Sequence, residues 1–296
     1  MPSSPTTAFT VLAADGARIT AYRALPAGRP KAIVQIAHGM AEHAARYRRL
    51  TDALTAAGYG VYANDHRGHG ASAAAHGLGE FGPGGFQSLV DDMAAVSRLA
   101  QAEAPNAPLV VLGHSMGSFA AQLYLLEHHT RLAGLVLSGT AAVDALVEAM
   151  AAAGEAAGPA SMNDAFAPAR TDFDWLSRDE AEVDAYVADP LCGFVLADAA
   201  MASVLQTAGA ARHDPRLASV RGDLPVYVIS GEHDPVTGPS QAFVATLLGS
   251  WRAAGLARVD HKVYPGGRHE MFNETSREEV TADLIAWLDA TVAWGA

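Results

Sequence analysis

The chain has 296 residues, half of them apolar and 18% charged, so it can bury the core of one large α/β domain with an insertion, or of two small domains. Its formal net charge of −12 argues against nucleic acid and anionic membrane surfaces as partners, because both attract basic proteins, but it leaves neutral lipids open. The one cysteine, Cys192, excludes an intramolecular disulfide.

Targeting and membrane-spanning signals are not found in the sequence. The start of the chain lacks a basic segment followed by an apolar one, so we expect no signal peptide. No apolar run is long enough to cross a bilayer. We therefore expect a soluble, cytoplasmic protein that makes at most transient contact with membranes or lipid aggregates. The sequence indicates no particular oligomeric state.

Strands and helices alternate along the first 139 residues. The Asp15-Gly16 pair between two short apolar runs predicts an antiparallel hairpin at the edge of a larger sheet. Continuous apolar runs are typical of strands that are buried on both faces, and they occur at 32–37, 61–64, 109–112 and 132–138. Apolar residues at helical spacing predict helices over 45–57 and 86–104.

The alternation stops between residues 140 and 224, which are rich in alanine. Helical patches there cover 143–153, 179–188 and 194–208. Strands and helices then alternate again, with strands over 225–230 and 259–264 and helices over 240–248 and 276–294. We therefore expect an α/β core in two parts, 1–139 and 225–296, and a helical cap formed by 140–224. The fold class is α/β, with a mostly parallel sheet, helices on both faces and the cap inserted after the sixth strand.

A glycine-flanked serine lies at the junction between a predicted strand and a predicted helix, in G-H-S-M-G at 113–117. That context favours a nucleophile elbow, a sharp turn that exposes Ser115, over an ordinary glycine-containing loop. Gly113 and Gly117 would let strand and helix pass close to each other. The backbone N–H of Met116 opens the helix and would form half of an oxyanion hole.

A serine nucleophile needs a base and an acid that orients the base, in the chain order Ser, Asp or Glu, His. Asp234 follows the predicted strand 225–230 and is our candidate acid, with Glu232 as its competitor. His269 follows the strand 259–264 inside a glycine-rich loop and is our candidate base. Other histidines lie too near the acid, within a strand or inside the elbow.

The second oxyanion donor should come from the loop after strand 32–37. H-G-M occupies that loop at 38–40, and the N–H of Met40 is the candidate donor. Asp65, His66 and His69 invite comparison with metal ligands, but the sequence has no H-E-x-x-H motif and no Cys/His pairing. We expect His66 and His69 to hold a hydrogen-bonded loop beneath the site, and we expect no metal.

The sequence resembles the α/β-hydrolases, and within them the monoacylglycerol lipase and lysophospholipase-like branch, often labelled serine aminopeptidase-like hydrolases. The resemblance covers nearly the whole chain. Its motifs are H-G-M-A-E-H at 38–43 with R-Y at 46–47, N-D-H-R-G-H-G-A-S at 64–72, G-H-S-M-G at 113–117, D-W-L-S-R-D at 174–179, D-P-L-C at 189–192, S-G-E-H-D-P-V at 230–236 and G-G-R-H-E at 266–270.

The resemblance implies a serine hydrolase without a cofactor. Ser115, Asp234 and His269 carry over as the catalytic triad, and the N–H groups of Met40 and Met116 as the oxyanion hole. The cap should cover an apolar acyl tunnel. Candidate lining residues in the cap are Met150, Met162, Phe166, Phe173, Leu191, Phe194, Leu196, Met201 and Leu205.

The expected activity is hydrolysis of carboxylic esters, with a monoacylglycerol or a similar single-chain ester or lipid as the small-molecule substrate. A lysophospholipase, a thioesterase or a peptidase could use the same triad on another bond. A non-catalytic, ligand-binding α/β-hydrolase is a remote alternative, because such proteins usually lose a triad member and none is missing here.

Overall fold

One eight-stranded sheet forms the centre of the molecule. The computed structural model describes residues 6–153 and 162–294. The strands run in the order β1-β2-β4-β3-β5-β6-β7-β8. At one edge of the sheet β1 pairs antiparallel with β2, and β2 pairs antiparallel with β4. The pairs from β4 to β8 are parallel, so the predicted mostly parallel sheet with an edge hairpin is confirmed. The strands are β1 Thr7–Leu12, β2 Arg18–Ala24, β3 Ile33–Ala37, β4 Gly60–Asn64, β5 Leu109–His114, β6 Leu132–Ser138, β7 Val226–Gly231 and β8 Val259–Tyr264.

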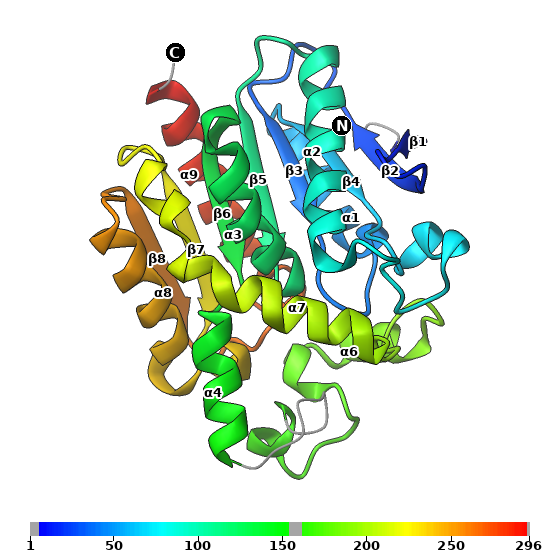
Figure 1. The fold of residues 1–296 in the computed structure, drawn as a ribbon, viewed down its shortest axis with the longest axis vertical. Helices are drawn as coiled ribbons and strands as arrows, with labels where there is room; N and C mark the ends of the chain where they lie inside the picture. The colour runs from blue at the N-terminus through cyan, green and yellow to red at the C-terminus, as the bar shows by residue number, and fades with distance from the viewer. Residues whose placement is uncertain (1–5, 154–161, 295–296) are drawn as a thin grey trace.

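Helices cover both faces of the sheet (Figure 1). On one face α2 Gly85–Glu103, α3 Met116–His128 and α8 Ala242–Ala253 pack in one apolar cluster. On the other face α1 Arg48–Ala56 and α9 Arg277–Trp294 pack in a second cluster. Every residue of β3, β4, β5 and β7 is buried, as expected for strands with helices on both sides.

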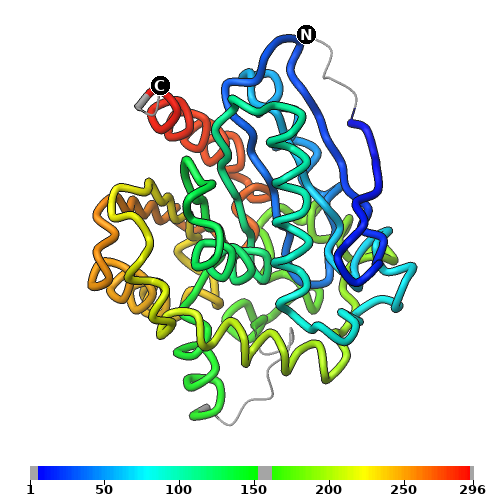
Figure 2. The backbone as a smooth tube through the Cα atoms, turned by 45° about the horizontal axis from the view of Figure 1, so that its top comes forward, coloured from blue at the N-terminus to red at the C-terminus, as the bar shows by residue number. Residues whose placement is uncertain are grey.

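The segment between β6 and β7 is helical and lies beyond the carboxyl ends of the parallel strands (Figure 1). It contains α4 Val143–Ala153, α6 Glu180–Ala188 and α7 Asp198–Ala210. Figure 2 shows the same segments gathered at that end of the molecule. Residues 154–161 of the expected cap lie outside the described residues. Among the helices described, none is long and apolar enough to cross a membrane.

Three helix starts differ from the expected ones. The helix expected over 45–57 begins at Arg48, because residues 44–47 form a 3-10 helix. The helix expected over 194–208 begins at Asp198, because Ala197 is extended and its N–H donates to the carbonyl of Gly79 in the core. The helix expected over 240–248 begins at Ala242, because the two preceding residues have positive φ angles, which a right-handed helix cannot contain. It continues to Ala253. All three shifts come from backbone conformations that apolar spacing does not encode.

Short 3-10 helices connect many of these elements. They are η1 Ala44–Tyr47, η2 Gly70–Ala75, η3 His129–Arg131, η4 Asp164–Phe166, η5 Asp174–Leu176, η6 Ala211–His213, η7 Pro215–Ser219, η8 Pro235–Thr237, η9 Pro239–Gln241 and η10 Met271–Asn273.

Candidate active site

Ser115 occupies a strained turn between β5 and α3. Its φ of 51° and ψ of −122° lie in a region that non-glycine residues rarely adopt. The turn requires glycine on both sides, because a Cβ at Gly113 would overlap the backbone of Gly117, and one at Gly117 would overlap the carbonyl of Ala37. The side chain of Ser115 therefore stands at the carboxyl end of the sheet, as a nucleophile elbow requires.

Asp234 and His269 form a buried pair beside this turn. Asp234 follows β7, His269 lies in the loop after β8, and the distance from His269 Nδ1 to Asp234 Oδ1 is 2.9 Å. Burial alone would lower the pKa of His269, but the charge and hydrogen bond of Asp234 raise it above its ordinary value. Within the described chain, the other ring nitrogen, Nε2, is buried and has no hydrogen-bond partner. His269 can therefore accept a proton at Nε2 while Asp234 holds Nδ1.

The loop after β3 places its backbone against Ser115. A Cβ built on Gly39 would lie 3.2 Å from the Cβ of Ser115, so the absence of a side chain allows this close approach. Met40 and Ser115 line the same cavity. Ala41 has a φ of 53°, which is unusual for alanine and indicates that other contacts impose the loop conformation.

Glu42 is one of those contacts. Its carboxylate accepts the backbone N–H of Gly39, the hydroxyl of Tyr47 at 2.7 Å and Nη1 of Arg46 at 2.8 Å. Burial favours the neutral acid, but Arg46 and these donors hold the pKa of Glu42 below its ordinary value. An ionised carboxylate therefore fixes the loop that carries the candidate oxyanion donor.

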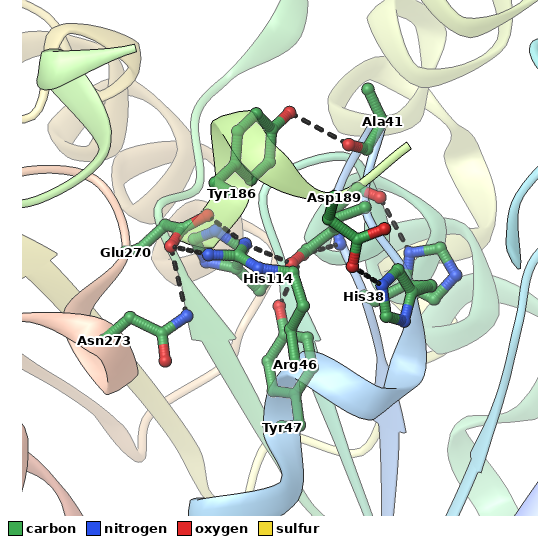
Figure 3. A network of polar contacts seen from close by, with 12 residues as sticks. His38, Ala41, Arg46, Tyr47, His114, Tyr186, Asp189, Glu270 and Asn273 are labelled. Atoms are coloured by element: carbon green, nitrogen blue, oxygen red, sulfur yellow. Dashed lines mark hydrogen bonds and ion pairs between the residues drawn. The ribbon is translucent and has the colours of Figure 1, made fainter. Parts of the chain in front are cut away.

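Arg46 joins two buried carboxylates, and Figure 3 shows it beside one of them, Glu270. Its guanidinium donates through both Nη atoms to Glu270, next to His269 in sequence, as well as to Glu42. Nδ2 of Asn273 donates to Glu270 at 3.0 Å. The sequence analysis did not single out Glu42, Arg46 or Glu270 as functional, although all three lie in the motifs quoted for the resemblance.

Residues of the cap also contact the site. The hydroxyl of Tyr186 and the N–H of Gly193 both donate to the carbonyl of Ala41, each at 2.9 Å. The centroids of the Trp175 indole and the His269 imidazole lie 4.8 Å apart. The backbone carbonyl of Trp175 accepts the backbone N–H of His269 at 3.3 Å. The cap therefore fixes both the loop after β3 and the candidate base.

A cavity of about 160 Å³ lies between the cap and the core. Ser115, His269 and Met40 line it on the core side, and six of the nine residues predicted from the cap line it as well. Those six are Met150, Met162, Phe173, Phe194, Met201 and Leu205. Tyr186, Glu42 and Glu270 give the cavity a polar part beside the candidate catalytic residues.

The other three predicted lining residues lie outside this cavity. Phe166 packs its ring under the guanidinium of Arg268, 4.4 Å from the centroid. Leu191 is exposed on a turn, and Leu196 is buried in the main apolar core. Helical and apolar patterning marks all three as suitable for burial but does not tell one apolar environment from another.

The loop histidines pack against one another beneath the site. Nε2 of His38 accepts the N–H of His66 at 2.9 Å, and the rings of His38 and His69 lie 5.2 Å apart. Burial lowers the pKa of His69 to about 4 and that of His66 well below 6.5. The Asp65 carboxylate accepts hydrogen bonds from two backbone N–H groups and a tyrosine hydroxyl, and so holds the surrounding loops together.

Comparisons with known proteins identify the family. The family model described as serine aminopeptidase, S33, matches residues 28–276. A monoacylglycerol lipase from Mycolicibacterium smegmatis is 32% identical over 97% of this chain and 99% of its own length. A mouse monoglyceride lipase is 29% identical over 95% of this chain and 89% of its own length. The crystal structure of a carboxyl esterase from Bacillus coagulans superposes with a TM-score of 0.85 at 26% identity, covering 98% of this chain and all of the other. The chain therefore has the α/β-hydrolase fold and belongs to this serine aminopeptidase S33 family, as a hydrolase of the esterase and monoacylglycerol-lipase kind.

Proposed function

We propose that this protein is a serine ester hydrolase with Ser115 as nucleophile, His269 as base and Asp234 as the orienting acid. The observation that carries the proposal is the buried Asp234–His269 pair, whose imidazole lines the same cavity as the strained serine turn. The reaction requires no cofactor.

The reaction follows from this arrangement. Ser115 Oγ attacks the ester carbonyl carbon and transfers its proton to Nε2 of His269, while Asp234 stabilises the imidazolium. The N–H groups of Met40 and Met116 donate to the oxyanion. When the tetrahedral intermediate collapses, His269 returns the proton to the departing alcohol. A water deprotonated by His269 then attacks the acyl-serine, which releases the acid and restores Ser115.

The two parts of the cavity favour a single-chain ester of a small polar alcohol. Methionine, leucine and phenylalanine side chains of the cap suit an acyl chain. The carboxylates of Glu42 and Glu270 can accept hydrogen bonds from hydroxyl groups on the alcohol side. A monoacylglycerol has both features, and two of the relatives described above carry the name of that activity.

A fluorophosphonate probe and a substrate panel test the proposal. The probe should label the wild type and the Ser219→Ala control, in which an exposed serine is removed, but not Ser115→Ala. Steady-state rates should be highest for monoacylglycerols, against lysophospholipids, thioesters and aminoacyl anilides. Unchanged turnover in Ser115→Ala contradicts the mechanism. A clear preference for another member of the panel keeps the mechanism and replaces the substrate. A wild type that the probe does not label indicates a ligand-binding protein instead.

A further inference from the structure

Three side chains with different metal-binding atoms meet between the core and the cap. His43 belongs to the loop after β3, while Asp189 and Cys192 belong to the turn that follows α6. One ligand atom from each, the imidazole nitrogen, a carboxylate oxygen and the thiol sulfur, lies within 4.8 Å of the other two. His43 Nε2 and Asp189 Oδ2 are 2.9 Å apart. All three residues are half-buried. Within the part of the chain that the structure describes, this is the one group of three or more such residues.

Backbone hydrogen bonds hold the donors in place. The N–H of Leu191 donates to Asp189 Oδ1 at 2.9 Å, which leaves Oδ2 directed at His43. The N–H of Cys192 donates to the carbonyl of Asp189 at 3.0 Å and closes the turn. The next residue, Gly193, donates to Ala41 and joins the turn to the loop of His43. The donors therefore need little rearrangement to share one ion.

We propose that His43, Asp189 and Cys192 form a binding site for one Zn²⁺ ion that is separate from the catalytic residues. Imidazole nitrogen, carboxylate oxygen and thiolate sulfur are the donors that Zn²⁺ takes, at about 2.0–2.3 Å. Donors of a tetrahedral site then lie about 3.5 Å apart. Here His43 Nε2 and Asp189 Oδ2 are 2.9 Å apart and all three donor atoms lie within 4.8 Å of one another, so shifts of about 1 Å bring them to that spacing. Cys192 binds as the thiolate and gives up its proton to solvent, and water completes the fourth position.

The surrounding charges permit a cation at this place. Arg46 is the nearby positive group, but its guanidinium is bonded to the carboxylates of Glu42 and Glu270. The ion would therefore enter a region where acidic charge exceeds basic charge. Bound Zn²⁺ ties the loop that carries Met40 to the cap, so it stabilises the folded chain in proportion to its occupancy.

Cobalt substitution tests the site, because Cys192 is the one cysteine of the chain. The full-length protein, freed of metal with a chelator and dialysed, is titrated with Co²⁺ and then with Zn²⁺. We expect a thiolate-to-cobalt charge-transfer band that saturates at one equivalent and that one equivalent of Zn²⁺ abolishes. The melting temperature should rise with added Zn²⁺.

Matched variants decide whether these three residues are the ligands. Cys192→Ser, which preserves size, should lose the band, and both Cys192→Ser and His43→Asn should weaken Zn²⁺ binding at least about tenfold. His213→Asn is the control, because His213 forms the same 2.9 Å contact with an aspartate, Asp144, but has no cysteine beside it. It should bind like the wild type. Absence of the band in the wild type, or unchanged Zn²⁺ affinity in Cys192→Ser, would overturn the proposal. Neither measurement depends on esterase activity, so this test can fail while the proposed function stands.

Discussion

Removal of the Tyr186 hydroxyl should slow catalysis without removing any proposed catalytic residue. This hydroxyl and the N–H of Gly193 are the two donors to the carbonyl of Ala41, whose positive φ the loop must maintain. Met40, the candidate oxyanion donor, directly precedes Ala41. In Tyr186→Phe the ring remains in place under the guanidinium of Arg46, which lies 4.8 Å from its centroid. The substitution therefore removes one hydrogen bond and little packing.

The expected magnitude follows from that single hydrogen bond. A buried hydrogen bond contributes about 1 kcal/mol net. If the loop loses that much preference for the conformation that presents the Met40 N–H, kcat should fall about fivefold. KM should change less than kcat, because the oxyanion forms only in the transition state and not in the bound ester.

Steady-state kinetics on a soluble 4-nitrophenyl ester, together with urea unfolding, provide the assay. Tyr59→Phe is the matched control, because the Tyr59 hydroxyl donates to Asp289 at 2.7 Å and lies at the start of β4, at the opposite end of the sheet. Both variants should lose about 1 kcal/mol of unfolding free energy, but only Tyr186→Phe should lose kcat. Equal kcat values for the two variants would refute the coupling between cap and loop.

Three further predictions concern the acid, the elbow and the buried histidines. Asp234→Asn should lower kcat about 10⁴-fold. It should also shift the acid limb of the residual pH–rate profile to lower pH, because the charge that raises the pKa of His269 is gone; an unmoved limb contradicts this. Gly117→Ala should cost more than about 2 kcal/mol in urea unfolding, because its Cβ overlaps a β3 carbonyl, and wild-type stability would show that the turn is looser than described. Burial lowers the pKa values of His69 and His114 to about 4. Below pH 6.5 the unfolded chain therefore binds more protons than the folded one, and the free energy of unfolding decreases as the pH is lowered. Between pH 7 and pH 5 each of these two histidines should lower the free energy of unfolding by about 2 kcal/mol, and the raised pKa of His269 should offset part of this loss. Equal urea midpoints at the two pH values would contradict the prediction.

The candidate catalytic residues could be predicted because each follows a strand of a parallel sheet. Ser115, Asp234 and His269 come after β5, β7 and β8, and the carboxyl ends of parallel strands lie at one edge. Short motifs after apolar runs are visible in a single sequence. The 2.9 Å contact between Asp234 and His269 agrees with that reasoning, while the assignment of their roles stays a prediction.

The polar network around Arg46 could not be derived in this way. Arg46 and Glu270 are 224 residues apart, and neither their residue types nor their positions match those of a catalytic motif. Their pairing depends on how the loop after β8 passes over the loop after β3, which is a tertiary property. A buried ion pair of this kind leaves no periodic signal, because it uses one residue from each segment.

The cap shows most clearly where local patterns stop being informative. Large apolar residues scattered in alanine-rich helices are predicted to be buried. By that criterion Leu196 and Met201 are equally good candidates to line the cavity. Leu196 nevertheless packs in the core, while Met201 lines the cavity, because α7 begins only at Asp198. The contacts that bear on the proposed chemistry are those between the cap and the carbonyl of Ala41, and they cross the junction between cap and core. A cap that moved far enough to break the Tyr186 and Gly193 hydrogen bonds would also release the loop that carries Met40. In the proposed mechanism, movement of the cap would therefore act on the candidate oxyanion donor Met40 through one carbonyl group, and the Tyr186→Phe kinetics measure the strength of that coupling.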